Sequence, residues 1–161
     1  MLQRGYFFQF WFFGALILIY LCLPILRKFL NSKRSYLYIL SFFVATGLIF
    51  ELVNIILQMP LQSYVIQTFR LWTWLFYYIL GGLVAQFDKD IIKNAFKRWM
   101  KIVSILLVLI SPVILFFIAK TIYHNLFAEY FYDILFVKIV SLGFFLTVLT
   151  LSLEENKSKW I

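Results

Sequence analysis

Charged residues are scarce in this chain. Only 14% of its 161 residues are Asp, Glu, Lys or Arg, whereas 64% are hydrophobic and 22% are aromatic. A soluble globular domain has about 25% charged and about 45–50% apolar residues, so the polar surface here is too small to cover a water-soluble domain. The composition also excludes a disordered chain and a collagen-like chain. It predicts a polytopic membrane protein.

Cysteine and histidine each occur once, as Cys22 and His124. A single cysteine cannot form an intrachain disulfide, and one cysteine with one histidine cannot form a metal-ligand cluster. We therefore expect no metal and no bound cofactor. Cys22 lies in an apolar run, where a lone cysteine is expected to act as a small buried hydrophobe. The sequence also contains no Gly-rich nucleotide loop, no Walker-type loop and no Ser–His–Asp set.

Long apolar runs, separated by charged segments, predict five transmembrane helices. Each run is long enough to cross a hydrocarbon core of about 30 Å, and none shows the alternation of a barrel strand. The charged connector over residues 88–101 is predicted as an interfacial amphipathic helix. The fold class is therefore an all-α membrane helix bundle. The expected spans are residues 6–26, 36–57, 65–87, 102–119 and 134–153, followed by a cytoplasmic tail over residues 154–161.

Lys and Arg alternate between the two ends of these spans. The loop after the first span has four and the connector after the third has five, whereas the loop after the second has none. By the positive-inside rule this predicts a cytoplasmic C-terminus and an N-terminus outside. Topology thus explains the net charge of +8, and no nucleic acid is expected as a partner. The expected partner is the lipid bilayer, whose anionic lipids the basic loops would contact.

Polar residues inside the apolar runs are the candidates for a site, because a charge at the bilayer centre costs about 2.5–3.5 kcal/mol. Glu51 and Asn54 are predicted to share one face of the second span. A face of the third span carries one cation, one hydroxyl and two amphipathic rings, namely Arg70, Thr73, Trp74 and Tyr77. Such a face could bind an anionic or sugar-like group. The candidate substrate-binding residues are Arg70, Trp72, Trp74, Glu51 and Asn54.

Simpler explanations for these residues stay open. Arg70 could snorkel to the outer interface, beside an aromatic belt of Trp72, Trp74 and Tyr64. Glu51 could pair with Arg70, be solvated at the outer mouth or take a chemical role.

Three further features lie near the spans. His124 is expected to be solvated in an outer loop rather than catalytic. Lys138 is expected to snorkel from the outer end of the fifth span, with Asp133 and Glu129 as neutralising neighbours. Gly81 and Gly82 are expected to allow close helix packing.

Three stretches resemble a known family. Residues 10–26, FWFFGALILIYLCLPIL, resemble the "WF–aliphatic–Y–x–x–x–P" helix of the acyltransferase 3 family. These proteins are integral-membrane O-acyltransferases of surface polysaccharides. Residues 68–82, TFRLWTWLFYYILGG, resemble a later helix of that family, and residues 141–145, SLGFF, resemble its last helix. The resemblance covers essentially the whole chain, in the family's order, and corresponds to the C-terminal half of the family.

The resemblance implies acyl transfer, with acyl-CoA as co-substrate. An acetyl group from acetyl-CoA at the cytoplasmic face would move to a sugar hydroxyl that a His base deprotonates. The family's proposed catalytic Arg and His would precede Met1, and His124 does not match them, so the catalytic residues are unknown here. We expect a truncated or split acyltransferase of a bacterial-type inner membrane, inactive alone and completed by an N-terminal half.

Other functions fit the same composition. The chain could be a non-enzymatic polytopic protein, such as a transporter or a component of polysaccharide or lipid export. Transporters usually show paired broken helices with charges inside the membrane. Here only Pro112 lies deep within a span and the polar residues gather at outer ends, which disfavours this alternative. A structural membrane protein without a ligand is the third hypothesis.

Overall fold

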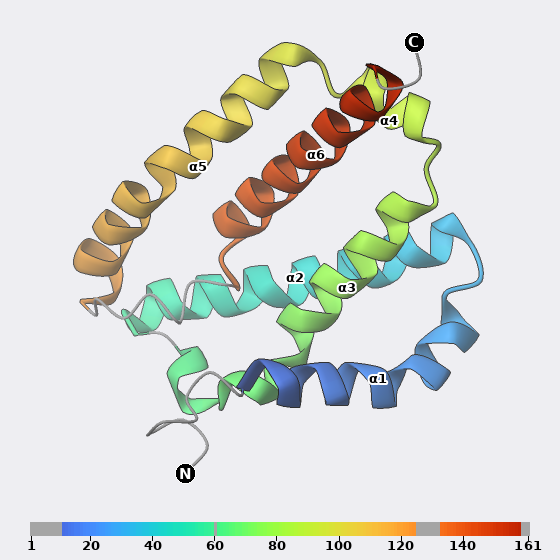
Figure 1. The fold of residues 1–161 in the computed structure, drawn as a ribbon. Helices are drawn as coiled ribbons and strands as arrows, with labels where there is room; N and C mark the ends of the chain where they lie inside the picture. The colour runs from blue at the N-terminus through green and yellow to red at the C-terminus, as the bar shows by residue number, and fades with distance from the viewer. Residues whose placement is uncertain (1–10, 60, 125–132, 159–161) are drawn as a thin grey trace. The chain divides into compact units, whose positions relative to one another are not determined.

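The described part of the chain is helical. The computed structural model describes residues 11–59, 61–124 and 133–158, and no strand occurs in these ranges (Figure 1). Four helical segments within them are long and apolar enough to cross a membrane, and a fifth apolar helix is shorter. The predicted all-α membrane architecture is confirmed. The chain divides into two compact units, Met1–Gln86 and Phe87–Ile161.

The first unit contains three α-helices, joined by a short connection over residues 30–32 and by two 3-10 turns. The basic residues expected in a loop after the first span instead lie in the last turn of the first helix and the first turn of the second. The second helix packs along the third, and the first packs on the third and on the turn before it. Ile19, Leu75 and Ile79 form the buried core between the first and third helices. The elements are α1 (Trp11–Phe29), α2 (Lys33–Leu57), η2 (Leu61–Tyr64), η3 (Gln67–Phe69) and α3 (Leu71–Ala85).

Two of the expected spans agree closely with helices of this unit. Helix α1 covers most of the span expected at 6–26, of which residues 6–10 lie outside the described ranges. Helix α2 begins three residues before the span expected at 36–57, because the Ser32 hydroxyl caps it by accepting a hydrogen bond from the Ser35 N–H at 3.2 Å. It ends at Leu57, where Gln58 adopts a left-handed conformation with φ 51°.

The third span differs from the expected range of 65–87. Helix α3 begins at Leu71 and has 15 residues, which extend about 22 Å at ~1.5 Å per residue. That length is short of the about 30 Å of a hydrocarbon core. The preceding residues form 3-10 turns instead, because side chains take over the hydrogen bonds of their backbone.

A glycine pair lies in α3, but only one member is needed for packing. A Cβ added at Gly82 would lie 3.0 Å from the Tyr36 ring of α2, whereas one added at Gly81 would meet nothing within 4 Å. The expectation of close packing is confirmed for Gly82 and wrong for Gly81. A similar approach joins α1 to η3, where a Cβ on Gly14 would lie 2.8 Å from the Thr68 methyl group.

The second unit is dominated by two long helices that pack along each other (Figure 1). A π-helical turn continues the first of them, so its apolar stretch runs from Arg98 to Tyr123, beyond both ends of the expected 102–119. The other continues to Ser158, so five residues of the expected tail are helical. The elements are α4 (Lys89–Ala95), α5 (Arg98–Ile118), η4 (Ala119–Tyr123) and α6 (Leu135–Ser158).

The single amphipathic helix expected over residues 88–101 is wrong. The Asp88 carboxylate caps a short helix by accepting a hydrogen bond from the Asp90 N–H at 2.9 Å. That helix ends at Ala95, and Phe96 leaves the helical region with φ −92° and ψ 82°. The expected apolar face is therefore divided between two helices. Phe96 is buried, whereas Trp99 is exposed at the start of α5.

Helix α5 runs through Pro112. Proline has no N–H to donate to the carbonyl four residues earlier, which is that of Val108. The Ser111 hydroxyl donates to this Val108 oxygen at 2.8 Å. The side chain thus replaces the missing backbone donor, which matters in a hydrocarbon environment without water.

Small residues form the contact between α5 and α6. A Cβ added at Gly143 of α6 would lie 2.7 Å from the Ser104 oxygen of α5, so the two helices can be this close only with glycine there. Thr147 and Thr150, further along α6, are buried, and their hydroxyls donate to the Gly143 and Leu146 carbonyls of the same helix. Such interfaces of small residues are typical of membrane helices.

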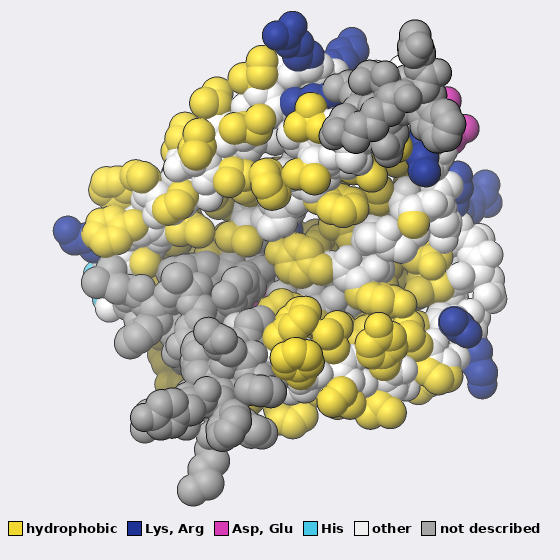
Figure 2. Space-filling view, in the orientation of Figure 1, with side chains coloured by type: hydrophobic (Ala, Val, Ile, Leu, Met, Phe, Trp, Pro, Cys, Tyr) yellow, Lys and Arg dark blue, Asp and Glu magenta, His cyan; other side chains and the backbone are white. Residues whose placement is uncertain are grey.

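Large apolar side chains also cover the outside. Tyr20, Ile56 and Leu109 are each more than 60% exposed, and yellow hydrophobic side chains dominate the visible parts of α1 and α5 in Figure 2. Exposed apolar surface on this scale marks a membrane-contacting protein. The chain is an integral membrane protein.

Candidate functional site

Polar side chains are buried where α2 ends and α3 begins. Asn54, Gln67, Arg70 and Thr73 are at most 4% exposed, and we call these four residues the polar cluster. Burying a polar group is costly unless it is hydrogen-bonded. Within the described residues no buried side-chain nitrogen or oxygen lacks a hydrogen-bond partner. The cluster is therefore an internally satisfied polar region in an apolar unit.

Asn54 connects α2 to the turn that follows it. Its side-chain oxygen accepts a hydrogen bond from the Leu61 N–H at 2.9 Å, and its backbone oxygen accepts one from the Met59 N–H at 3.2 Å. Asn54 thus holds the chain as it leaves α2. Glu51, one turn earlier on the same helix, is half-buried. The prediction that these two residues share one face of a helix is confirmed by their placement in α2.

Arg70 connects the two 3-10 turns to α3. Its Nε donates to the Val65 carbonyl at 3.2 Å, and its own carbonyl accepts hydrogen bonds from the Thr73 and Trp74 N–H groups at the start of α3. The side chain is 4% exposed. The snorkelling alternative is therefore wrong, because a snorkelling arginine extends its guanidinium into water.

The two candidate tryptophans have different partners. The Trp74 indole N–H donates to the Gln67 carbonyl at 2.9 Å. The Trp72 ring stacks on Phe50 of α2, with centroids 5.0 Å apart and an interplanar angle of 23°. The hydrogen bond of Trp74 therefore stabilises η3, and the stacking of Trp72 packs α3 against α2. Tyr64, the third member of the expected belt, is 73% exposed.

The structure brings the five candidate residues to one place, although not by the expected geometry. Arg70, Thr73, Trp74 and Tyr77 were expected on one face of a single helix. Arg70 instead precedes α3, so helical spacing does not place it. The stacking of Phe50 on Trp72 brings the turn of α2 that carries Glu51 to the start of α3. That these residues bind a substrate stays a prediction.

Gln67 is the member of the polar cluster that the sequence analysis missed. It is 2% exposed, and its backbone oxygen accepts the hydrogen bonds of Trp74 and of the Arg70 N–H. The sequence could have indicated Gln67, because it is an amide side chain inside an apolar run. Placing a polar side chain in a membrane segment costs free energy, so such residues are candidates for a site.

In the second unit the structure corrects the expectation for Lys138. This residue lies in the first turn of α6 and is 3% exposed, and Asp133 just before the helix is equally buried. Lys138 therefore does not snorkel. The two buried groups carry opposite charges and neither is without a partner. Glu129 lies outside the described residues.

The structure supports the solvated role expected for His124. Its side chain is exposed, and it ends the π-helical turn in a left-handed conformation with φ 49°.

No group of three or more His, Cys, Asp or Glu side chains that could hold a metal ion occurs among the described residues. Cys22 is a half-buried free thiol rather than a fully buried one.

The sequence of the whole chain agrees with one family of membrane enzymes. The model of the acyltransferase 3 family, described as an acyltransferase domain, matches residues 1–161. The chain belongs to the acyltransferase 3 family. No curated protein and no solved structure matches it. The resemblance found in the three sequence stretches is thereby confirmed at the level of the family.

For an acyltransferase 3 protein, the polar cluster offers one kind of chemistry. A guanidinium has five N–H donors and no acceptor, so it favours oxygen-rich groups such as carboxylates, carbonyls and hydroxyls. In this acyltransferase 3 chain, the fixed charge of Arg70 lies in a low-dielectric unit, where it acts more strongly than in water. Residues 1–86 contain no histidine, so the first unit has no imidazole to serve as a base.

Proposed function

We propose that this chain acts in the O-acylation of a surface polysaccharide. An acetyl group from acetyl-CoA at the cytoplasmic face is transferred to a sugar hydroxyl on the outer side. The single observation that carries the proposal is the match of the acyltransferase 3 family over residues 1–161. A buried arginine at the start of α3, the helix that also carries Trp72 and Trp74, agrees with a sugar acceptor.

The orientation of the chain is part of this proposal. The C-terminus and both basic segments lie in the cytoplasm, and the N-terminus lies outside, because Lys and Arg are retained on the cytoplasmic side. The junction of α2 and α3 then faces outwards, since it is at the opposite end of α2 from the first turn, which carries Lys33 and Arg34. This is the side on which a surface polysaccharide is met.

Within the proposed site, Arg70 orients the acceptor and Trp72 and Trp74 form the wall beside it. Asn54 and Glu51 hold that wall from α2. The sugar hydroxyl also needs a general base to become a nucleophile. We assign this role to a histidine of another polypeptide segment, since the first unit has none. Transfer then forms the sugar ester bond and breaks the thioester bond, and the proton ends on the CoA thiol.

The test is gene deletion and complementation in the native host, where all other components are present. Two quantities are measured, the surface polysaccharide itself and the base-labile acetyl groups per sugar. We expect the deletion to remove the acetyl groups and leave the polysaccharide in place. Wild-type chain restores acetylation, whereas Arg70→Ala reduces it about tenfold or more at equal abundance in the membrane, as expected when a charged hydrogen-bond donor is lost.

Arg34→Ala is the matched control, because Arg34 is an exposed arginine of the same unit. It should restore acetylation fully. Unchanged acetylation in the deletion strain would overturn the proposal. Loss of the polysaccharide itself would support a component of export instead.

A further inference from the structure

The second unit has a pocket with a concentration of positive charge. The pocket has a volume of about 340 Å³ and lies where α4, the start of α5 and Leu151 of α6 meet. Lys93, Lys97, Arg98 and Lys101 line it, and none of the lining residues that the structure describes is acidic. We call it the basic pocket. Its charge suits an anion with several oxygens, such as a phosphate group.

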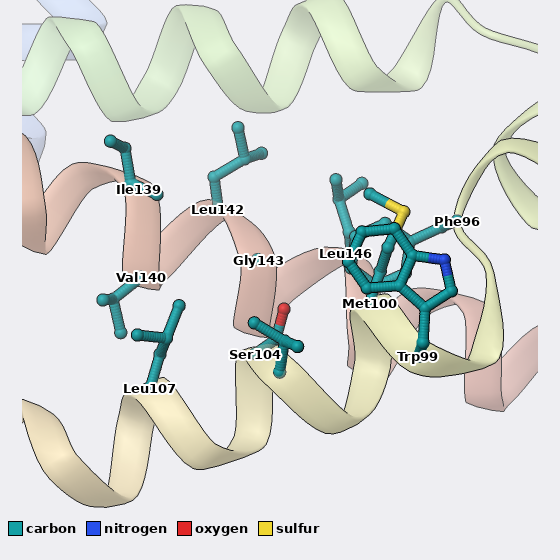
Figure 3. Close-up of a pocket in the computed structure, with 11 residues that line it drawn as sticks. Phe96, Trp99, Met100, Ser104, Leu107, Ile139, Val140, Leu142, Gly143 and Leu146 are labelled. Atoms are coloured by element: carbon teal, nitrogen blue, oxygen red, sulfur yellow. The ribbon is translucent and has the colours of Figure 1, made fainter.

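An apolar groove lies next to the basic pocket. It has a volume of about 300 Å³ and runs between α5 and α6 (Figure 3). Its floor is the close approach of Gly143 to Ser104. From Met100 to Leu107 it follows about two turns of α5, or about 11 Å. Among the described lining residues only Ser104 carries a hydroxyl and none is charged, so the groove suits a hydrocarbon chain.

Phe96 joins the two features. This buried residue lines both the basic pocket and the apolar groove. In Figure 3, Trp99 and Met100 lie at the same end of the groove as Phe96, and Leu107 and Ile139 lie towards the other end. The charged pocket is therefore at one end of the hydrocarbon groove, and the groove continues from it along the two membrane helices.

The electrostatics at the start of α5 also favour an anion. The first turn of this helix carries Arg98 and Lys101 and has no acidic residue, and Lys97 at the N-cap makes no capping hydrogen bond through its side chain. The N-terminus of a helix is the positive end of its dipole, so cations here are unfavourable. An anion bound in the basic pocket would interact favourably with this end of the helix.

We propose that the second unit binds one anionic phospholipid, with its phosphate in the basic pocket and an acyl chain in the apolar groove. The order of the two features matches a lipid in its own leaflet, with the headgroup at the ends of the helices and the chain towards the bilayer interior. The basic end is the one predicted to be cytoplasmic, and the cytoplasmic leaflet is the anionic one. This inference does not depend on the proposed acyl transfer.

The first experiment measures lipid binding by the purified full-length chain. The chain is held in neutral phosphatidylcholine nanodiscs, titrated with phosphatidylglycerol, and its bound lipid is counted by native mass spectrometry. We expect one phosphatidylglycerol to be retained. The double variant Lys97→Gln with Arg98→Gln should bind it about thirtyfold more weakly, a factor of about five for each cation removed near an anionic group.

The matched control removes two cations elsewhere. Arg27→Gln with Lys28→Gln lowers the net charge equally but lies in the last turn of α1, where both residues are exposed. This variant should keep wild-type affinity. If it loses as much affinity as the pocket variant, or if the pocket variant binds within about twofold of wild type, general charge attraction explains the result and the proposal is overturned.

The groove is tested separately from the pocket. Gly143→Leu should place a side chain on the groove floor and prevent retention of the lipid, whereas Gly81→Leu, where an added Cβ meets nothing within 4 Å, should not. Because Gly143→Leu could prevent folding, wild-type chain is also cross-linked with a phosphatidylglycerol that carries a photoreactive acyl chain. Cross-links should occur on α5 and α6 around Ser104, and cross-links confined to other helices would overturn the proposal.

A free phosphate compound could occupy the basic pocket without a lipid. Acetyl-CoA, which has phosphates but no long chain, is therefore added as a competitor at the concentration of phosphatidylglycerol that half-saturates the chain. We expect the lipid to stay bound. Displacement of the lipid by acetyl-CoA would assign the pocket to a soluble phosphate ligand and overturn the lipid site.

Discussion

The two units handle polar groups in different ways. In the first unit, the described side-chain bonds of the polar cluster and Trp74 join residues five to seven positions apart. They span the stretch from Leu61 to Arg70, which is not α-helical. In the second unit, the described hydroxyl bonds return to carbonyls three or four residues earlier in the same helical segment, as at Ser111, Thr147 and Thr150.

This difference has a physical meaning. A backbone that leaves the helix inside an apolar environment must find other partners for its N–H and C=O groups, and each unmet group costs several kcal/mol. The first unit supplies those partners through Asn54, Arg70 and Trp74. In the long helices of the second unit most backbone groups already bond to each other. The hydroxyls there therefore need only an acceptor for their own O–H groups. Removing a side-chain hydrogen bond of the polar cluster should therefore cost more than removing one of these hydroxyl bonds in the second unit.

Arg70→Ala should have the largest effect on stability. It removes the hydrogen bond to the Val65 carbonyl and leaves the cluster without its cation. We expect a loss of about 3 kcal/mol in the free energy of unfolding, because a hydrogen bond to a charged group is lost and a buried acceptor is left unpaired. Denaturant titration in detergent measures it. Arg34→Ala, which is exposed, should change it by less than about 0.5 kcal/mol, and equal effects would contradict the comparison.

Asn54→Leu should come next. The substitution keeps the number and branching of the side-chain heavy atoms but leaves the Leu61 N–H without its acceptor, at an expected cost of about 2 kcal/mol. Its counterpart in the second unit is Thr150→Val, which removes a hydroxyl bond to a carbonyl of its own helix. That change should cost about 0.5 kcal/mol, near the average for hydrogen bonds in membrane proteins. The same denaturant titrations measure the free energy of unfolding of both variants. A larger loss of this free energy for Thr150→Val than for Asn54→Leu would contradict the proposed difference between the units.

The glycine pair of α3 gives a smaller, internal comparison. Gly82→Leu should destabilise the first unit by about 1.5 kcal/mol, because its side chain would overlap the Tyr36 ring. Gly81→Leu should be neutral or stabilise α3, because glycine is a poor helix former and the site is open. Thermal unfolding of the two variants in the same detergent tests this. Equal melting temperatures would show that α2 and α3 do not pack as described.

Ser111→Ala should also have a small effect, about 0.6 kcal/mol. It removes the hydroxyl that donates to the Val108 carbonyl above Pro112. In a Pro112→Ala background the restored backbone N–H can donate instead, so the same Ser111→Ala change should cost almost nothing. A double-mutant cycle measures this coupling. An unchanged cost in the Pro112→Ala background would mean that the serine does not substitute for the missing donor.

Hydrophobic run length predicted which segments are helical but not where each helix begins. The start of α2 depends on the cap at Ser32, and capping moves a boundary by a few residues. The start of α3 depends on Arg70, Gln67 and Trp74, whose mutual bonds become visible only when the chain is folded. Periodicity then gave the wrong geometry for Arg70, because helical spacing has no meaning outside a helix.

The candidate site could be located in part from the free-energy cost of placing polar residues inside a membrane. Charged and amide residues inside apolar runs identified Glu51, Asn54 and Arg70, and the structure places them at one junction. The burial of Lys138 and Asp133 could not be predicted in the same way. Position near a helix end suggested snorkelling, whereas the fold provides an opposite charge that is also buried. Which of the two occurs depends on tertiary packing.

The short α3 has a consequence for the biogenesis of the protein. A segment of 15 helical residues, preceded by turns whose backbone is satisfied by other residues, is a poor independent substrate for insertion into a bilayer. Asn54 of α2 provides the acceptor for Leu61 before α3 begins. We therefore expect α2 and α3 to enter the membrane as a hairpin, with α2 beside the insertion site until the third segment has been synthesised.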